Sequence, residues 1–205
     1  MGSDHDVGYN QRMNLILFAA PWWVNLLLLV PVVAFIYSRK DKFSISKRQL
    51  AQVALFGIAF GFVEASVVIY LRAILGFLPG YMGTLSDMIQ QGSMYNQAHV
   101  LNVLPVGIFT IEFYREAATI VMLAVVALLS VRKFKERCAI FLLAFAFWDL
   151  FYYIFLWLFI RWPSSLTTPD VLFLIPVPWL SEVWFPLLVS VSTVIVIVLN
   201  SKQSE

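Results

Sequence analysis

The sequence predicts an all-α integral membrane protein, a bundle of five transmembrane helices that forms a single domain over residues 1–205. Three observations predict this class. Of the 205 residues, 61% are hydrophobic and only 13% are charged, whereas soluble domains carry roughly 25% charged residues. The mean hydropathy is +0.84. Five apolar segments are long enough to cross a bilayer, so lipid is expected to surround most of the chain.

Each predicted span follows from the length of its apolar segment. A transmembrane helix needs about 20 predominantly apolar residues to cross the hydrocarbon core. The segments that meet this requirement are residues 15–37, 50–75, 108–131, 138–160 and 180–199. Pro21 and Pro31 in the first segment are compatible with a span, because neighbouring helices can satisfy the freed backbone groups.

Basic residues are concentrated on one side of the predicted bundle. Ten of the fourteen fall there, namely Arg39, Lys40, Lys42, Lys47, Arg48, Arg132, Lys133, Lys135, Arg137 and Lys202. Loops rich in Lys and Arg stay in the cytoplasm, so the N-terminus is expected outside and the C-terminus in the cytoplasm. The expected location is the plasma (inner) membrane, which the chain crosses several times.

Two connections are expected on the outer side of the membrane. Residues 76–107 are too polar in their first half to span, and the apolar second half is short. An interfacial or re-entrant segment is therefore expected there. The connection between the fourth and fifth spans contains four prolines, and its FLIPVPW core is expected in the headgroup region. Tryptophan side chains, which favour this interface, would anchor it.

Polar and small residues recur at three- and four-residue steps on four of the expected helices, so each helix has one distinct face. These faces contain, in chain order, Gly57, Gly61, Glu64, Ala65, Val68 and Arg72; Glu112, Glu116, Thr119, Ala127 and Ser130; Ala146, Asp149, Tyr152 and Tyr153; and Pro186, Ser190, Thr193 and Asn200. The small residues are expected to let helices pack closely. The four faces should meet inside the bundle.

The ionisable residues within the spans need a separate explanation. An aspartate such as Asp149 at the centre of a span costs on the order of 2.5–3.5 kcal/mol on insertion scales. One interhelical hydrogen bond returns only about 0.6–2 kcal/mol. Asp149 and Glu64 have either a functional role or a structural role in an ion pair, and the sequence leaves both open. The candidates for binding a ligand or protons, expected in the outer half of the bundle, are Glu64, Arg72, Glu112, Arg115, Glu116, Asp149, Tyr152, Tyr153 and Arg161.

Residue types argue against most cofactors and against nucleic acid. The chain has one cysteine and two histidines, which excludes an internal disulfide, a cysteine metal cage and a buried bis-histidine haem. No metal is predicted; His99 and Met94 are weak candidates for Cu(I) ligands. No cofactor is predicted either, although the aromatic fourth span leaves a bound lipid, quinone or pigment open. No phosphate-cradling loop or nucleic-acid-binding surface is present.

Three classes of function are compatible with these residues. The preferred one is a non-catalytic integral subunit of a larger membrane assembly, with membrane lipid and other membrane-protein subunits or a second copy as partners. The second is a proton or small-solute carrier that uses Glu64 and Asp149. The third is an intramembrane enzyme acting on a lipid or quinone, with one of these acids as the general acid or base. Catalytic residues are not assigned, and enzymatic activity is not favoured.

Overall fold

A computed structural model describes residues 18–74 and 106–202, and most of these residues are helical. Four helices are long and apolar enough to cross a membrane: Trp22–Lys40, Lys47–Ala73, Gly107–Ser130 and Phe134–Ile160. The first of these begins as the 3-10 helix η1 (Trp22–Leu28) and continues as α1 (Leu29–Lys40). The other long helices are α2 (Lys47–Ile74), α5 (Val106–Ser130) and α6 (Phe134–Ile160).

The fifth expected span is only partly helical. Helix α7 covers Trp184–Leu199, which is 16 residues, and begins four residues later than expected. Residues Trp179–Glu182 form the strand β3 instead. By length and composition, the described residues therefore contain four candidate spans and one shorter apolar helix.

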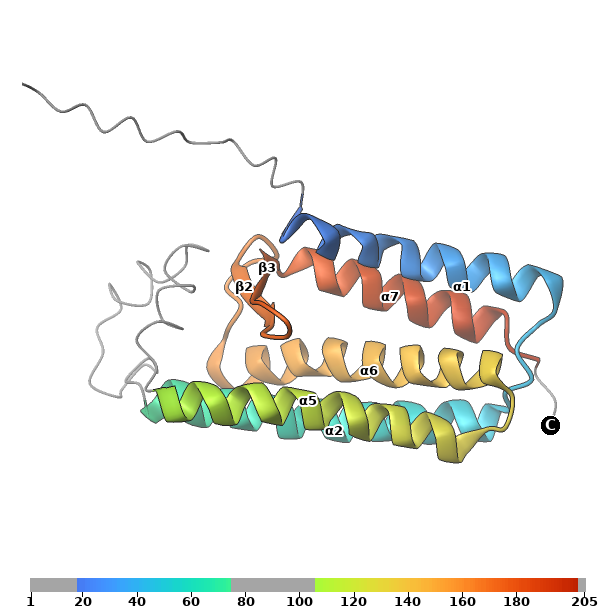
Figure 1. Cartoon of the computed structure of the whole chain (residues 1–205), viewed down its shortest axis with the longest axis horizontal. Coiled ribbons are helices and arrows are strands. Elements are labelled where there is room, and N and C mark those ends of the chain that lie inside the picture. The colour runs from blue at the N-terminus through green and yellow to red at the C-terminus, as the bar shows by residue number, and fades with distance from the viewer. Residues whose placement is uncertain (1–17, 75–105, 203–205) are drawn as a thin grey trace, which may run out of the picture.

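Helix α6 lies at the centre of the bundle (Figure 1). It packs against α2, α5 and α7, and α7 in turn packs against α1. The α2–α6 contact is the closest. A Cβ atom on Gly57 would lie 2.6 Å from the Cβ of Phe147, and one on Gly61 would lie 2.8 Å from the carbonyl oxygen of Trp148. The packing role expected for these two glycines is confirmed.

A three-stranded antiparallel sheet closes one end of the bundle, and the expectation of a purely α-helical chain was wrong in this respect. Strand β2 (Pro169–Phe173) pairs with β3, which also pairs with the two-residue strand β1 (Ala19–Ala20). In the register, Ser181 lies opposite both Ala19 and Asp170. The prolines of this connection interrupt helical hydrogen bonding, and strand pairing satisfies the backbone groups that a helix would otherwise pair. We call this the hairpin end.

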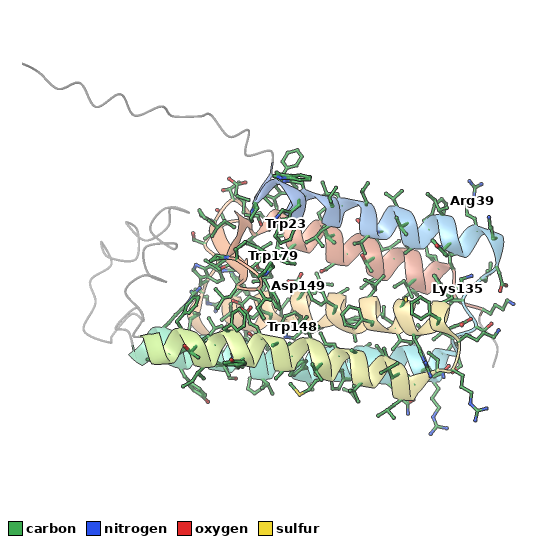
Figure 2. All side chains as sticks on the ribbon, viewed as in Figure 1. Trp23, Arg39, Lys135, Trp148, Asp149 and Trp179 are labelled. Atoms are coloured by element: carbon green, nitrogen blue, oxygen red, sulfur yellow. The ribbon has the colours of Figure 1, made fainter. Side chains whose placement is uncertain are left out.

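The opposite end carries the basic connections and the C-terminal segment, and we call it the basic end. Arg39 and Lys135 lie here, away from Trp23 and Trp179 at the hairpin end (Figure 2). The N–H of Phe43 donates to the carbonyl of Asn200 at 3.0 Å, and the N–H of Lys202 donates back to the carbonyl of Phe43 at 2.7 Å. These two bonds tie the α1–α2 connection to the end of α7.

The half of the bundle next to the basic end has a filled apolar core. Its fully or almost fully buried side chains include Leu123, Ala127, Ala139, Ile140, Leu143 and Ile197. Among the described residues, the one buried carboxylate of this half is Glu136 in the first turn of α6, which accepts the Ser44 N–H at 3.4 Å. The expected interfacial or re-entrant segment at 76–107 falls almost wholly outside the described residues.

Candidate functional site

A cavity of about 530 Å³ occupies the half of the bundle next to the hairpin end. Side chains from α2, α5, α6, α7 and β2 line it, with smaller contributions from η1 and α1. Its wall is mostly apolar, as Val68, Leu71, Phe145, Leu172 and Val189 illustrate. Eight of the nine candidates from the sequence also line it: Glu64, Arg72, Glu112, Arg115, Glu116, Asp149, Tyr152 and Tyr153.

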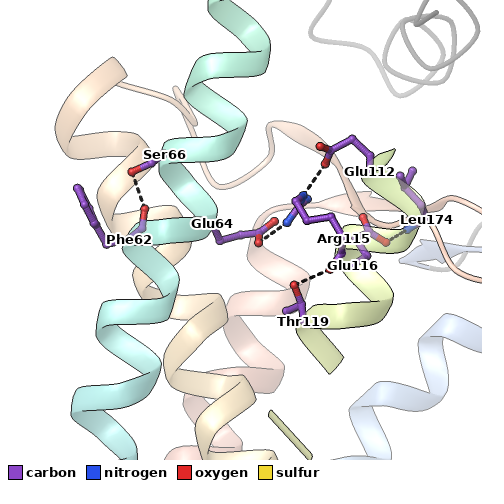
Figure 3. Close-up of polar contacts among 8 residues, drawn as sticks. All are labelled: Phe62, Glu64, Ser66, Glu112, Arg115, Glu116, Thr119 and Leu174. Atoms are coloured by element: carbon purple, nitrogen blue, oxygen red, sulfur yellow. Dashed lines mark hydrogen bonds and ion pairs between the residues drawn. The ribbon is translucent and has the colours of Figure 1, made fainter. Parts of the chain in front are cut away.

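Arg115 joins two buried carboxylates at the cavity wall (Figure 3). Its Nε lies 2.7 Å from Oε2 of Glu112, one turn earlier on α5, and its Nη1 lies 2.5 Å from Oε2 of Glu64 on α2. The first pair follows from the three-residue spacing on a helix. The second links α5 to α2 across the cavity. Glu64 and Glu112 are 8% and 7% exposed, so both carboxylates depend on this one guanidinium for a countercharge.

Glu116 ties α5 to the hairpin. Its Oε2 accepts a hydrogen bond from the backbone N–H of Leu174, the residue after β2, at 2.7 Å (Figure 3). The Thr119 hydroxyl donates to the carbonyl of Arg115 at 3.0 Å, so it satisfies itself within α5. The hairpin is therefore fixed over the cavity by a carboxylate that no described Lys or Arg neutralises through an ion pair.

Asp149, in the middle of α6, has a neutral partner. The Ser190 hydroxyl on α7 donates to its Oδ2 at 2.7 Å. Within the part of the chain that the structure describes, no Lys or Arg forms an ion pair with Asp149. Figure 2 shows Asp149 near the middle of the bundle, between α6 and α7, and its side chain lines the cavity. The carboxylate thus joins α6 to α7 and faces a space that it shares with the Arg115 group.

Asp170 on β2 belongs to the site, and sequence reasoning missed it. Its Oδ2 accepts a hydrogen bond from the Tyr153 hydroxyl at 2.8 Å, and both residues are buried. Burial raises the pKa of Asp170 to about 6, although the nearby Arg72 and the Tyr153 hydroxyl oppose this rise. Arg72 itself stacks on Trp162, with its guanidinium carbon 3.9 Å from the ring centroid.

The signal that could have identified Asp170 is weak. It is a single carboxylate directly before the apolar run VLFLI, in a connection that was expected to lie in the headgroup region. There an acid would be solvated and would need no partner. Only the pairing of β2 with β3 folds the connection back over the helices and buries this side chain.

Arg161 is the candidate that the structure does not bring to the cavity. It ends α6 in the left-handed conformation, with φ of 56°, which directs the chain away from the helix axis. Its exposed side chain lies over the Trp157 ring, 4.6 Å from the centroid. His99 and Met94, the weak metal candidates, lie outside the described residues.

Three aromatic side chains at the cavity retain unused polar groups. Trp148 is only 8% exposed, and neither its Nε1 nor that of Trp179 has a hydrogen-bond partner among the described residues. Tyr152 packs edge-on against Tyr153 at 4.9 Å between ring centroids, and its hydroxyl forms no hydrogen bond to another described residue. Buried donors without an acceptor are uncommon in folded proteins, so these side chains leave hydrogen-bonding capacity unused at the cavity.

Comparison of the chain with protein-family models, with curated proteins and with solved structures finds no match. Within residues 18–74 and 106–202, no three His, Cys, Asp or Glu side chains are grouped so that they could hold a metal ion. The site is therefore characterised by its own geometry. It combines an apolar wall, five carboxylates, two guanidinium groups and several aromatic rings around one cavity.

Proposed function

We propose that the chain is a multipass protein of the plasma (inner) membrane with five spans, its N-terminus outside and its C-terminus in the cytoplasm. Four long apolar helices support insertion in a membrane. The 16 residues of α7 are about 24 Å long, and the preceding strand β3 supplies the remaining length toward the outer headgroups. Arg39, Lys135 and Lys202 lie at the basic end, which the positive-inside rule makes cytoplasmic.

We further propose that this protein binds an amphiphilic small molecule in the cavity of the outer half. The observation that carries the proposal is a 530 Å³ cavity with a mostly apolar wall and a few convergent polar groups. Ligand sites typically have volumes of about 300–1,000 Å³ and this mixture of surfaces.

The surroundings of the cavity favour a ligand that arrives from the lipid phase. Helices α5 and α7 both line the cavity and both pack on α6, but they do not pack extensively on each other. The hairpin covers the end toward the aqueous side, where Leu174 is bonded to Glu116. A molecule with an apolar body and a polar head, such as a lipid or quinone, matches both this route and this wall.

The filled core next to the basic end favours binding over conduction through the membrane. The polar lining does not continue past Glu116 and Thr193 toward that end, where Leu123, Ile140 and Ile197 are fully buried. A proton or solute carrier needs access from both sides. The carrier hypothesis is therefore the less favoured one in this conformation.

We also propose that the chain is a subunit of a larger membrane assembly, because a subunit of an assembly can bind a ligand as well. Catalysis on the bound molecule stays one as well, with Asp149 or Glu64 as the general acid or base. One preparation separates them. Purification in a mild detergent as a lone monodisperse chain would argue against the assembly, and a chemically altered co-purified molecule would argue for an enzyme.

Ligand binding is tested with a matched pair of tryptophan substitutions on α2. Val68 lines the cavity, whereas Val63 is 53% exposed on the outer surface of the same helix. Mass spectrometry of lipid extracts should find an amphiphile enriched over bulk lipid in the wild type and in Val63→Trp. In Val68→Trp the enrichment should fall at least tenfold. If the wild type carries no enriched molecule, or if both variants retain it equally, the cavity is not a binding site.

A further inference from the structure

The groups that line the cavity are unbalanced in charge. They include five carboxylates, from Glu64, Glu112, Glu116, Asp149 and Asp170, but only two guanidinium groups, from Arg72 and Arg115. If all of them are ionised, the wall carries three more negative than positive charges. Such an excess inside a membrane bundle is costly, because the surroundings supply little solvation.

The two arginines are already engaged, so two of the acids are left without a basic partner. Arg115 lies between Glu64 and Glu112. Arg72 stacks on the Trp162 ring and is the basic residue near Asp170. Among the described residues, the hydrogen-bond partners of the remaining acids, Asp149 and Glu116, are neutral.

At Asp149 and Glu116, one carboxylate oxygen is satisfied and the other is not. Asp149 accepts the Ser190 hydroxyl, and Glu116 accepts the Leu174 backbone N–H, in each case through a single oxygen at 2.7 Å. The second oxygen of each has no hydrogen-bond partner among the described residues. Both side chains line the same cavity. A hydrogen-bonding cation in the cavity would find a free carboxylate oxygen there and would reduce the excess negative charge.

Aromatic rings at the cavity are a second, independent indication that the ligand is a cation. Trp148, Tyr152, Tyr153, Trp162 and Trp179 line the cavity. The faces of such rings attract ammonium groups, most strongly where water is excluded. The indole N–H of Trp148, a side chain more than nine-tenths buried, has no acceptor among the described residues. This N–H is buried away from the open space, so the donor available to an oxygen atom of a ligand is the hydroxyl of Tyr152.

We infer that the ligand of this cavity is a long-chain amine: an amphiphile with a protonated amino group and a neighbouring oxygen acceptor in its head. The ammonium lies in the cavity, where Asp149 and Glu116 supply negative charge without a basic partner, the oxygen accepts from the Tyr152 hydroxyl, and the tail lies along the apolar wall. This inference rests on the proposed function, because it names the chemical class of the same ligand. An anionic head would meet uncompensated carboxylates, and a neutral head would leave them without a countercharge.

The inference is tested with three probes of equal chain length: 2-aminododecan-1-ol, dodecane-1,2-diol and 2-hydroxydodecanoate. Dissociation constants are measured on the purified full-length protein in phosphatidylcholine nanodiscs at pH 7. We expect the amino alcohol to bind at least tenfold more tightly than the diol and the anion to bind most weakly. Asp149→Asn and Glu116→Gln should each reduce the affinity for the amino alcohol at least fivefold and leave the diol unchanged.

A matched control is Asp41→Asn, which removes a carboxylate outside the cavity. It should change no dissociation constant. Two results overturn the inference. If the diol binds as tightly as the amino alcohol, the site takes a neutral head, and ligand binding as such survives. If none of the three probes binds, both the inference and the proposed function fail.

Discussion

The two halves of the bundle are built from the same helices but differ in what they bury. Next to the basic end, α5, α6 and α7 fill their contact with Leu123, Leu143 and Ile197, which are fully buried. Next to the hairpin end, the same helices surround a cavity with charged residues such as Arg115 and Asp149. Each of these helices therefore contributes both to a filled core and to a cavity.

We infer from this difference that the half next to the basic end stabilises the fold and that the half next to the hairpin end binds the ligand. A filled apolar core stabilises a fold, because removal of any of its side chains leaves a void and loses van der Waals contacts. A cavity with buried charges does the opposite, and such features persist in proteins mainly where function requires them. Mutations in the two halves should therefore separate stability from ligand retention, as the following predictions specify in order of decreasing effect.

Arg115→Gln should have the largest effect, because it leaves the buried carboxylates of Glu64 and Glu112 without a countercharge. Loss of one partner of a buried ion pair costs about 3–5 kcal/mol. We expect a decrease of about 4 kcal/mol in the free energy of unfolding, measured by titration with a denaturing detergent. The triple variant with Glu64→Gln and Glu112→Gln should recover most of this loss. Equal stabilities of the single and triple variants would show that the loss does not come from the unpaired carboxylates.

Leu143→Ala tests the other half. Leu143 is fully buried in the apolar core and does not line the cavity. The cavity left by the substitution should lower the free energy of unfolding by about 3 kcal/mol, within the usual range for this change. Mass spectrometry should find the same amount of retained amphiphile as in the wild type. Loss of the amphiphile at unchanged stability would contradict the division between the halves.

Asp170 should make stability depend on pH. The pKa of its carboxyl is about 6 in the folded protein and 3.8 ordinarily, so the folded state binds this proton more tightly. Its contribution is therefore fully present below pH 3.8 and is lost as the pH rises through 6. The loss amounts to up to about 3 kcal/mol. The difference in unfolding free energy between wild type and Asp170→Asn, measured from pH 3 to pH 8, should show this change; a constant difference would exclude it.

Gly57→Ala should have the smallest of these effects and should act on both halves, because it separates α2 from α6. The added Cβ would lie 2.6 Å from the Cβ of Phe147 and 2.9 Å from the carbonyl oxygen of Ala144. The strain outweighs the better helix propensity of alanine and leaves a net loss of about 1–2 kcal/mol. Gly107→Ala is the control, since no atom lies within 4 Å of its added Cβ. Thermal unfolding should distinguish the two; equal melting temperatures would contradict the close contact.

Most of the helical framework could be predicted from the sequence, because hydropathy and helical periodicity are local properties. Helices α2, α5 and α6 begin and end within four residues of the segments predicted at 50–75, 108–131 and 138–160. The same periodicity assigned eight of the nine candidate residues to faces that meet at the cavity. It could not specify their partners. Arg115 and Glu64 are 51 residues apart, and only the crossing of α5 over α2 and α6 brings them to 2.5 Å.

The hairpin and the cavity were decided by tertiary structure alone. Prolines in the last outer connection indicated where a helix could not form, but the sheet, in which β3 pairs with both β2 and β1, joins segments that are far apart in sequence. This pairing buries Asp170 and delays the start of α7, while the left-handed end of α6 removes Arg161 from the site. A cavity is a volume that side chains of several helices leave unfilled. No periodicity within one segment encodes it, because it depends on how the helices cross.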